Sequence, residues 1–151
     1  MTTAIEKLRN YGYELPAYMA PVASYVPTTR SGNQLFVSGQ ISRNDAGPVI
    51  GKLGETMNVV QGGNAAELAA LWVLAQVFHA GVDLDAIKRV LKLTVLVNSA
   101  PEFTEHHLVA NGGSNLIVGV LGDRGKHARA AYGVAGLPLG AAVEIEAIVE
   151  V

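Results

Sequence analysis

The chain lacks cysteine and contains few charged or aromatic residues. Without cysteine it forms no disulfide, no thiolate metal site and no cysteine nucleophile. Charged residues make up 16% of the 151 residues, against the roughly 25% that is typical of soluble domains. The eleven basic residues are dispersed in a chain of net charge −2, so they form no basic stripe for a nucleic-acid backbone. We therefore do not expect a nucleic-acid partner.

Long apolar runs are also absent. No run approaches the ~20 residues that span a bilayer, although 50% of the residues are hydrophobic and the mean hydropathy is +0.29. The surplus apolar surface indicates burial between subunits, since obligate oligomer interfaces are more apolar than ordinary protein surface. The N-terminal segment carries charges and lacks the apolar core of a secretory signal. The sequence thus predicts a cytoplasmic homo-oligomer with no membrane association.

Hydrophobic periodicity and turn residues divide the chain into alternating strands and helices. Residues 1–20 are interpreted as an N-terminal extension with a helix at 3–10, and residues 21–151 as a single domain. In the first third of the domain, the patterns predict an extended segment at 22–29, a turn at 31–33, a strand at 35–41 and a glycine-rich loop at 44–54. A helix at 58–80 and a strand at 90–97 follow. The remainder is predicted to form helices at 102–110 and 114–121, separated by a break at Asn111-Gly112-Gly113, and two strands within 127–151 joined at Leu137-Pro138.

This order of elements predicts an α+β fold in two layers, with one sheet and two main helices on one of its faces. The other face of the sheet has no predicted cover. We expect it to pack against further copies of the chain in a closed, symmetric assembly.

Arg129 is the single arginine in an otherwise small and apolar strand, and it requires an anionic partner because an unpaired buried charge is very costly. If the last two strands pair around Leu137-Pro138, Glu144 comes close to Arg129. The arginine fork can then bind a substrate carboxylate while Glu144 orients a water molecule. The alternative, which the spacing alone favours, is a structural salt bridge between Arg129 and Glu144. Glu146 shares a strand face with Glu144, so one of the two can be functional while the other faces solvent or an interface.

Other candidate motifs are weak. His106, His107 and His127 are candidate metal ligands, but the adjacent pair points in different directions and no HExxH pattern accompanies the three. The glycine-rich stretches at 111–113 and 122–125 match neither a phosphate-binding loop nor a dinucleotide fingerprint. No serine elbow of the GxSxG type is present. We therefore predict no metal site and no cofactor.

Three segments carry a family resemblance: GNQLFVSGQI at residues 32–41, VLKLTVLV at 90–97, and residues 129–148 with the arginine, the Leu-Pro pair and the EIEAI strand. With them the chain resembles the Rid/YjgF family of reactive-intermediate deaminases, also called endoribonuclease L-PSP-like. The resemblance covers about residues 21–151. It implies a chorismate-mutase-like (YjgF-like) fold with a mixed sheet, a homotrimer whose sheets form a central barrel, and ligand clefts between subunits. The implied activity is cofactor-free hydrolysis of 2-imino or enamine acids to 2-keto acids and ammonia.

The resemblance also assigns residues to the cleft. Arg129 matches the arginine that binds the substrate carboxylate, and Glu144 matches the glutamate that places the attacking water. The other substrate-binding positions fall on Tyr25, Ser38, Gly39, Asn111 and the backbone N–H of Ala131. The chain departs from the family pattern at 23–26, where Ala-Ser-Tyr-Val replaces Gly-Pro-Tyr-Ser. It departs again at Ala131, which is often cysteine, and within 111–126, which is glycine-rich and carries an insertion.

Two other functions use parts of the same sequence. A non-catalytic protein that binds 2-keto acids or other small carboxylates needs Arg129 but not an activated water. An endoribonuclease is suggested by the alternative family name, but an isoelectric point of about 6.1 and only nine aromatic residues disfavour it.

Overall fold

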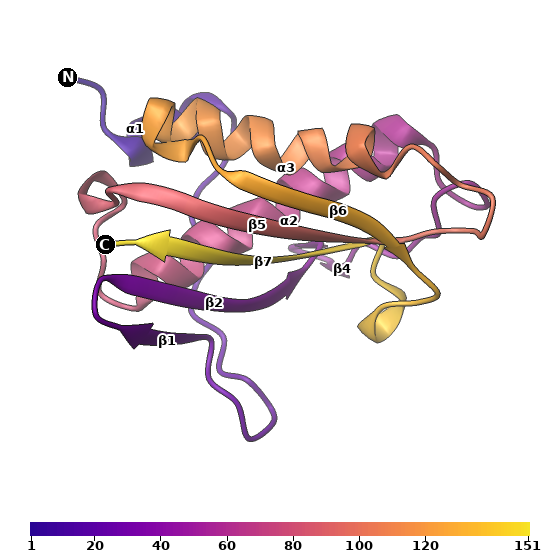
Figure 1. Cartoon of the computed structure of the whole chain (residues 1–151), viewed down its shortest axis with the longest axis horizontal. Helices are drawn as coiled ribbons and strands as arrows, with labels where there is room; N and C mark the ends of the chain where they lie inside the picture. Colours follow the sequence, from indigo (N-terminus) through magenta and orange to yellow (C-terminus); the bar gives the residue numbers. More distant parts are fainter.

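The C-terminal strand β7 (Val143–Glu150) shows how the sheet is organised, because buried and exposed side chains alternate along it. One set is buried against the helices: Val143, Ile145, Ala147 and Val149. The other set points to the opposite face of the sheet: Glu144, Glu146, Ile148 and Glu150. We call these the helix face and the open face. In this computed structural model, which describes residues 1–151, helix α2 (Val59–His79) passes behind the sheet, helix α3 (His106–Leu121) runs alongside β6, and the open face is uncovered (Figure 1).

Four other strands complete the sheet: β1 (Thr28–Ser31), β2 (Gln34–Ile41), β5 (Arg89–Asn98) and β6 (Ala128–Val134). Their order is β1-β2-β7-β5-β6, so β1 and β6 form the two edges (Figure 1). β6 runs parallel to β5, and all other neighbours are antiparallel. The mixed sheet with helices on one face confirms the predicted α+β sandwich.

The last two strands, which we expected to pair, are not neighbours. β5 lies between β7 and β6 and pairs with both of them, with a register shift against β7 between Val90 and Lys92. A short 3₁₀ turn, η3 (Pro138–Gly140), carries the chain from β6 across to β7. The turn at Leu137-Pro138 is therefore present, but it does not join a hairpin.

Helices α2 (Val59–His79) and α3 (His106–Leu121) cover the helix face. α2 begins where predicted, because the Asn58 side chain and Gln61 cap each other's backbone N–H groups. It ends before Gly81, whose φ of +89° suits a residue without a side chain. Neither helix has the length and apolar character needed to cross a membrane.

The break predicted at Asn111-Gly112-Gly113 is wrong, because α3 is one continuous helix. A Cβ on Gly112 would collide with the backbone oxygen of Gly63 in α2, and a Cβ on Gly113 would crowd the Ile145 side chain. The glycines therefore permit close packing of α3 on α2 and on the sheet. A local turn signal was overridden by tertiary packing.

The segment from residue 11 to residue 27 forms an irregular loop that passes below β1 in the view of Figure 1. The extended segment predicted at 22–29 is therefore largely wrong: only its last two residues belong to strand β1. The glycine-rich loop predicted at 44–54 contains a two-stranded hairpin, β3 (Arg43–Asn44) with β4 (Gly47–Pro48). The predicted N-terminal helix is confirmed as α1 (Ala4–Asn10), which buries Ala4 and Leu8 in the common core.

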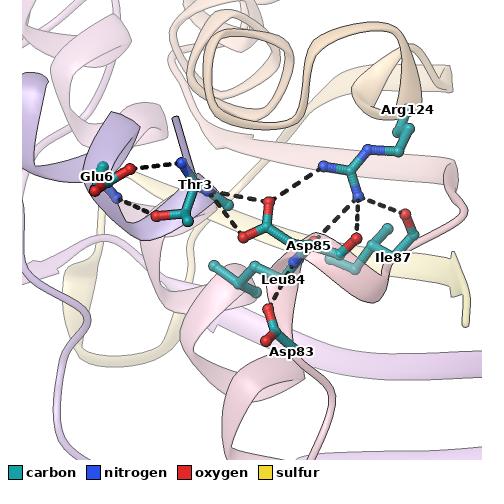
Figure 2. Close-up of polar contacts among 8 residues, drawn as sticks. Thr3, Glu6, Asp83, Leu84, Asp85, Ile87 and Arg124 are labelled. Carbon is teal, nitrogen blue, oxygen red and sulfur yellow. Dashed lines mark hydrogen bonds and ion pairs between the residues drawn. The ribbon is translucent and has the colours of Figure 1, made fainter. Parts of the chain in front are cut away.

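A polar network fixes the starts of β5 and β6 (Figure 2). Arg124 of the 3₁₀ turn η2 (Gly122–Gly125) donates to three backbone carbonyls in and after η1 (Leu84–Ala86), at 2.7 to 3.3 Å. The Asp85 carboxylate lies 3.7 Å from Arg124 and accepts the Ala4 N–H at 3.1 Å. Because η1 precedes β5 and η2 precedes β6, this network holds the two strand starts and α1 together.

Candidate functional site

Glu144 lies on the open face of β7, next to β2. The register between β2 and β7 shifts between Val37 and Gln40, so Ser38 and Gly39 form an irregular step in the strand. A Cβ on Gly39 would collide with the Glu144 carboxylate, so only glycine lets this carboxylate pack against the β2 backbone. Partial burial raises the pKa of Glu144, and repulsion from the Glu146 carboxylate adds to the effect.

A cavity of about 450 Å³ opens beside Glu144. Tyr25 and Gly39 line it together with Glu144, so the structure brings three of the predicted site residues to one place. The remaining walls come from the loop before β1, from the end of β2 and the start of β3, from α2 and from the η3 turn: Met19, Ala20, Pro21, Val22, Pro27, Gln40, Ile41, Arg43, Trp72, Gln76, Pro138 and Leu139. The cavity is mostly apolar, and Glu144 and Arg43 are the charged residues in its wall.

Ser38 is near this cavity but does not line it. Its hydroxyl donates to the Val26 carbonyl at 2.7 Å and so attaches the loop before β1 to strand β2. The residue borders a different hollow on the open face, of about 270 Å³, which also includes Lys92, Thr94 and Glu146. In one chain, Ser38 therefore shapes the neighbourhood of Glu144 without facing it.

Arg129 lies at the other side of the molecule, on edge strand β6. Its Nη1 donates to Asn111 Oδ1 at 2.9 Å and to Ser114 Oγ at 3.2 Å, and its Nη2 donates to the His107 carbonyl at 3.4 Å. These three partners lie at helical spacing on the side of α3 that faces β6. The structure thus brings the predicted residues Arg129 and Asn111 together. Ala131 follows two positions later on the same strand face.

Arg129 and Glu144 point to opposite faces of the sheet. Arg129 pairs with Leu93 of β5, whose side chain is buried under the helices, whereas Glu144 pairs with Leu96 on the open face. With strand β5 between them, the two side chains form no salt bridge within the chain. The prediction of a structural ion pair between Arg129 and Glu144 is therefore wrong within one protomer. Arg129 is instead held by the neutral groups of Asn111, Ser114 and His107.

Two residues beside Arg129, Ser114 and His127, were not assigned to the site from the sequence, which offered His127 only as a candidate metal ligand. Ser114 accepts from Arg129, and His127 in turn contacts Ser114 at 2.9 Å between Nε2 and Oγ. The available signal was the spacing of His107, Asn111 and Ser114, which places them on one side of a helix. The expected break at the glycines concealed that pattern.

Comparison with known proteins supports the resemblance seen in the sequence. A family model described as "YjgF/chorismate_mutase-like, putative endoribonuclease" matches residues 6–151. Protein TCP17 of Trypanosoma cruzi is 52% identical over 145 residues, covering 95% of this chain and 91% of that protein. The Agrobacterium tumefaciens protein Atu1372, whose function is unknown, is 49% identical with a TM-score of 0.92, covering 99% of this chain and 94% of that one.

More distant solved structures share the fold. A "putative endoribonuclease" from Shewanella oneidensis is 29% identical, with a TM-score of 0.94 and 99% of both chains covered. RidA from an Antarctic Psychrobacter species is 28% identical, with a TM-score of 0.59 over 87% of this chain and 92% of that one. Family model, relatives and fold agree over nearly the whole chain. The chain belongs to the YjgF/chorismate-mutase-like family, which includes RidA proteins and proteins described as endoribonucleases.

Proposed function

We propose that the protein is a cofactor-free deaminase that hydrolyses reactive 2-imino or enamine acids to 2-keto acids and ammonia. The observation that carries this proposal is that the Arg129 guanidinium keeps two free N–H donors. It has five N–H donors, of which three are engaged by Asn111, Ser114 and His107. The two others, Nε–H and one Nη2–H, are free on an exposed side chain and suffice for a bidentate pair with a carboxylate.

Glu144 suits the second requirement of the reaction. The oxygen of a water molecule adds to the C=N carbon, and both water protons pass in turn to the nitrogen. The C–N bond then breaks as the C=O bond forms, which releases the 2-keto acid and ammonia. A carboxyl group whose pKa is raised by burial accepts and returns a proton more readily near neutral pH. Glu144 is therefore the group we assign to orient the water and to transfer its proton.

The two residues cannot serve one substrate within a single chain because they lie on opposite sheet faces. We therefore propose a homotrimer in which Arg129 of one protomer approaches Glu144 of the next. A ring of identical, head-to-tail contacts repeats this pairing in every interface. Exposed apolar side chains on and near the open face favour burial there: Phe36 is 40% exposed, Tyr132 49% and Leu139 67%.

Two alternatives use the same surface. A non-catalytic carboxylate-binding protein requires Arg129 alone, and it predicts tight binding of 2-keto acids with no imine turnover. An endoribonuclease is suggested by the description of the family model, but the net charge of −2 gives it little attraction for a polyanion. We place the activity in the cytoplasm, with a small imino or keto acid as the ligand.

The test measures hydrolysis of 2-iminopropionate generated in solution by an amino-acid oxidase. Arg129→Ala is expected to lower kcat/KM by about a hundredfold, because a charged, bidentate hydrogen-bonded pair is lost. The matched control is Arg9→Ala, which removes an exposed arginine of α1 that pairs with Glu14. Undiminished turnover in an assembled Arg129→Ala variant refutes the assignment, and a wild-type protein that binds keto acids without turnover favours the binding protein.

A further inference from the structure

A chain of hydrogen bonds leads from the start of β6 to the Arg129 side chain. His127 Nδ1 lies 2.6 Å from the Gly125 carbonyl oxygen, and its Nε2 lies 2.9 Å from Ser114 Oγ. Ser114 Oγ lies 3.2 Å from Arg129 Nη1. The three links connect η2, strand β6 and helix α3 at one point, beside the guanidinium.

The chemistry of the groups fixes the direction of each bond. A carbonyl oxygen only accepts, so His127 Nδ1 carries the hydrogen and donates to Gly125. In a neutral imidazole Nε2 is then an acceptor, which commits the Ser114 hydroxyl hydrogen to it. The lone pairs of Ser114 Oγ are left to accept, and the Arg129 Nη1–H is the donor that uses one of them. Each bond therefore determines the next.

From this geometry we propose that Ser114 and His127 are positioning residues for Arg129, and the proposal rests on the deaminase function above. They do not contact the substrate. They hold the guanidinium plane so that Nε–H and the free Nη2–H face the cleft. An exposed arginine otherwise samples many rotamers, and ordering it on substrate binding costs affinity.

The far end of the chain of bonds is rigid. Gly125 packs so closely on α3 that a Cβ there would lie 2.6 Å from the Ile117 carbonyl oxygen. Arg124, the residue before it, is anchored to three carbonyls around η1 (Figure 2). The Gly125 carbonyl is thus a fixed acceptor, and the position of His127, Ser114 and Arg129 is set from it.

The experiment compares KM with kcat for imine hydrolysis. Ser114→Ala is expected to raise KM about tenfold, as the loss of one hydrogen bond to a charged group implies, while kcat stays within about twofold. Ser114→Thr keeps the hydroxyl and is expected to restore KM. His127→Gln is expected to raise KM less, by about threefold, and to have no further effect in the Ser114→Ala background because it acts through Ser114.

The matched control is Ser99→Ala, which removes another serine–histidine contact, 3.1 Å from Ser99 Oγ to His106 Nε2, that does not reach Arg129. Its KM is expected to stay unchanged. A normal KM in both Ser114→Ala and His127→Gln overturns the proposal, as do additive effects in the double variant. If Ser114→Ala does not assemble, the His127→Gln and Ser114→Thr variants decide. Arg129→Ala tests the deaminase function separately. If Arg129→Ala loses activity while Ser114→Ala keeps a normal KM, the positioning role is refuted and the deaminase function is not.

Discussion

Two inactive variants of this protein are expected to restore each other's activity when they assemble together. Arg129→Ala removes the proposed carboxylate anchor and leaves Glu144 intact, whereas Glu144→Gln removes the proposed water-positioning group and leaves Arg129 intact. The two side chains point to opposite faces of the sheet. In the proposed trimer, each cleft therefore takes its arginine from one protomer and its glutamate from the next. A mixed assembly therefore contains some clefts with both native residues.

The magnitude follows from this arrangement. In a random mixture of equal amounts, a cleft is intact when one protomer retains Arg129 and its neighbour retains Glu144, which gives about a quarter of wild-type activity in a ring of identical interfaces. The assay is co-expression with two different tags and measurement of imine hydrolysis in the unselected mixture. Purification through both tags removes the homotrimers and is expected to raise the value to about a third, because each mixed ring of three has one intact cleft. Each variant alone is expected to show less than about one hundredth of wild-type activity.

A second mixture provides the control. Wild-type chains mixed with the Arg129→Ala/Glu144→Gln double variant retain about a quarter of full activity if clefts are shared, and about half if each chain holds a complete site. Mixed assemblies of the two single variants that remain inactive, together with half activity in this control, would refute the division of the site between protomers.

Two further predictions concern stability. Gly112→Ala is expected to destabilise the protein by about 1–2 kcal/mol, because overpacking against Gly63 outweighs the gain in helix propensity; Gly63→Ala, whose Cβ meets nothing within 4 Å, is expected to stabilise it by about 0.5–1 kcal/mol. Urea denaturation checks both, and equal effects contradict the close-packing explanation. Glu144→Gln is expected to raise Tm at neutral pH. Folding raises the pKa of the Glu144 carboxyl above its usual value of 4.5, so the protonated carboxyl favours the folded state. This contribution is fully present below pH 4.5 and is lost as the pH rises. Melting curves from pH 4 to 8 should show the two proteins converging at the acid end, and a constant difference contradicts the pKa argument.

The layer arrangement was predictable because it depends on periodicity. Buried and exposed residues alternate along β7, and capping residues mark the start of α2. The order of the strands was not predictable in the same way. Two strands joined by a short turn usually pair, but β6 is fixed beside β5 by the α3 crossover, and β7 occupies the other side of β5. No local signal distinguishes these outcomes.

The candidate site was likewise predictable only in part. The family pattern identified Arg129 and Glu144, and the structure adds that each has its own neighbours: Asn111 beside the arginine, and Gly39 with Tyr25 beside the glutamate. Ser114 was missed because Asn-Gly-Gly is a turn signal when read locally. Only the contact between Gly112 and α2 explains why a helix continues through it.

The edge position of β6 has a consequence for the protein at low concentration. An edge strand presents unpaired backbone groups on its outer side, and Arg129 stands on this one. Under the proposed assembly, dilution below the dissociation constant would abolish turnover while each protomer stayed folded. Specific activity would then fall steeply with dilution. The free protomers would expose the unpaired edge of β6 and the apolar side chains of Phe36, Tyr132 and Leu139. Subunit affinity, rather than protomer stability, would set the lowest concentration at which the protein works and stays soluble.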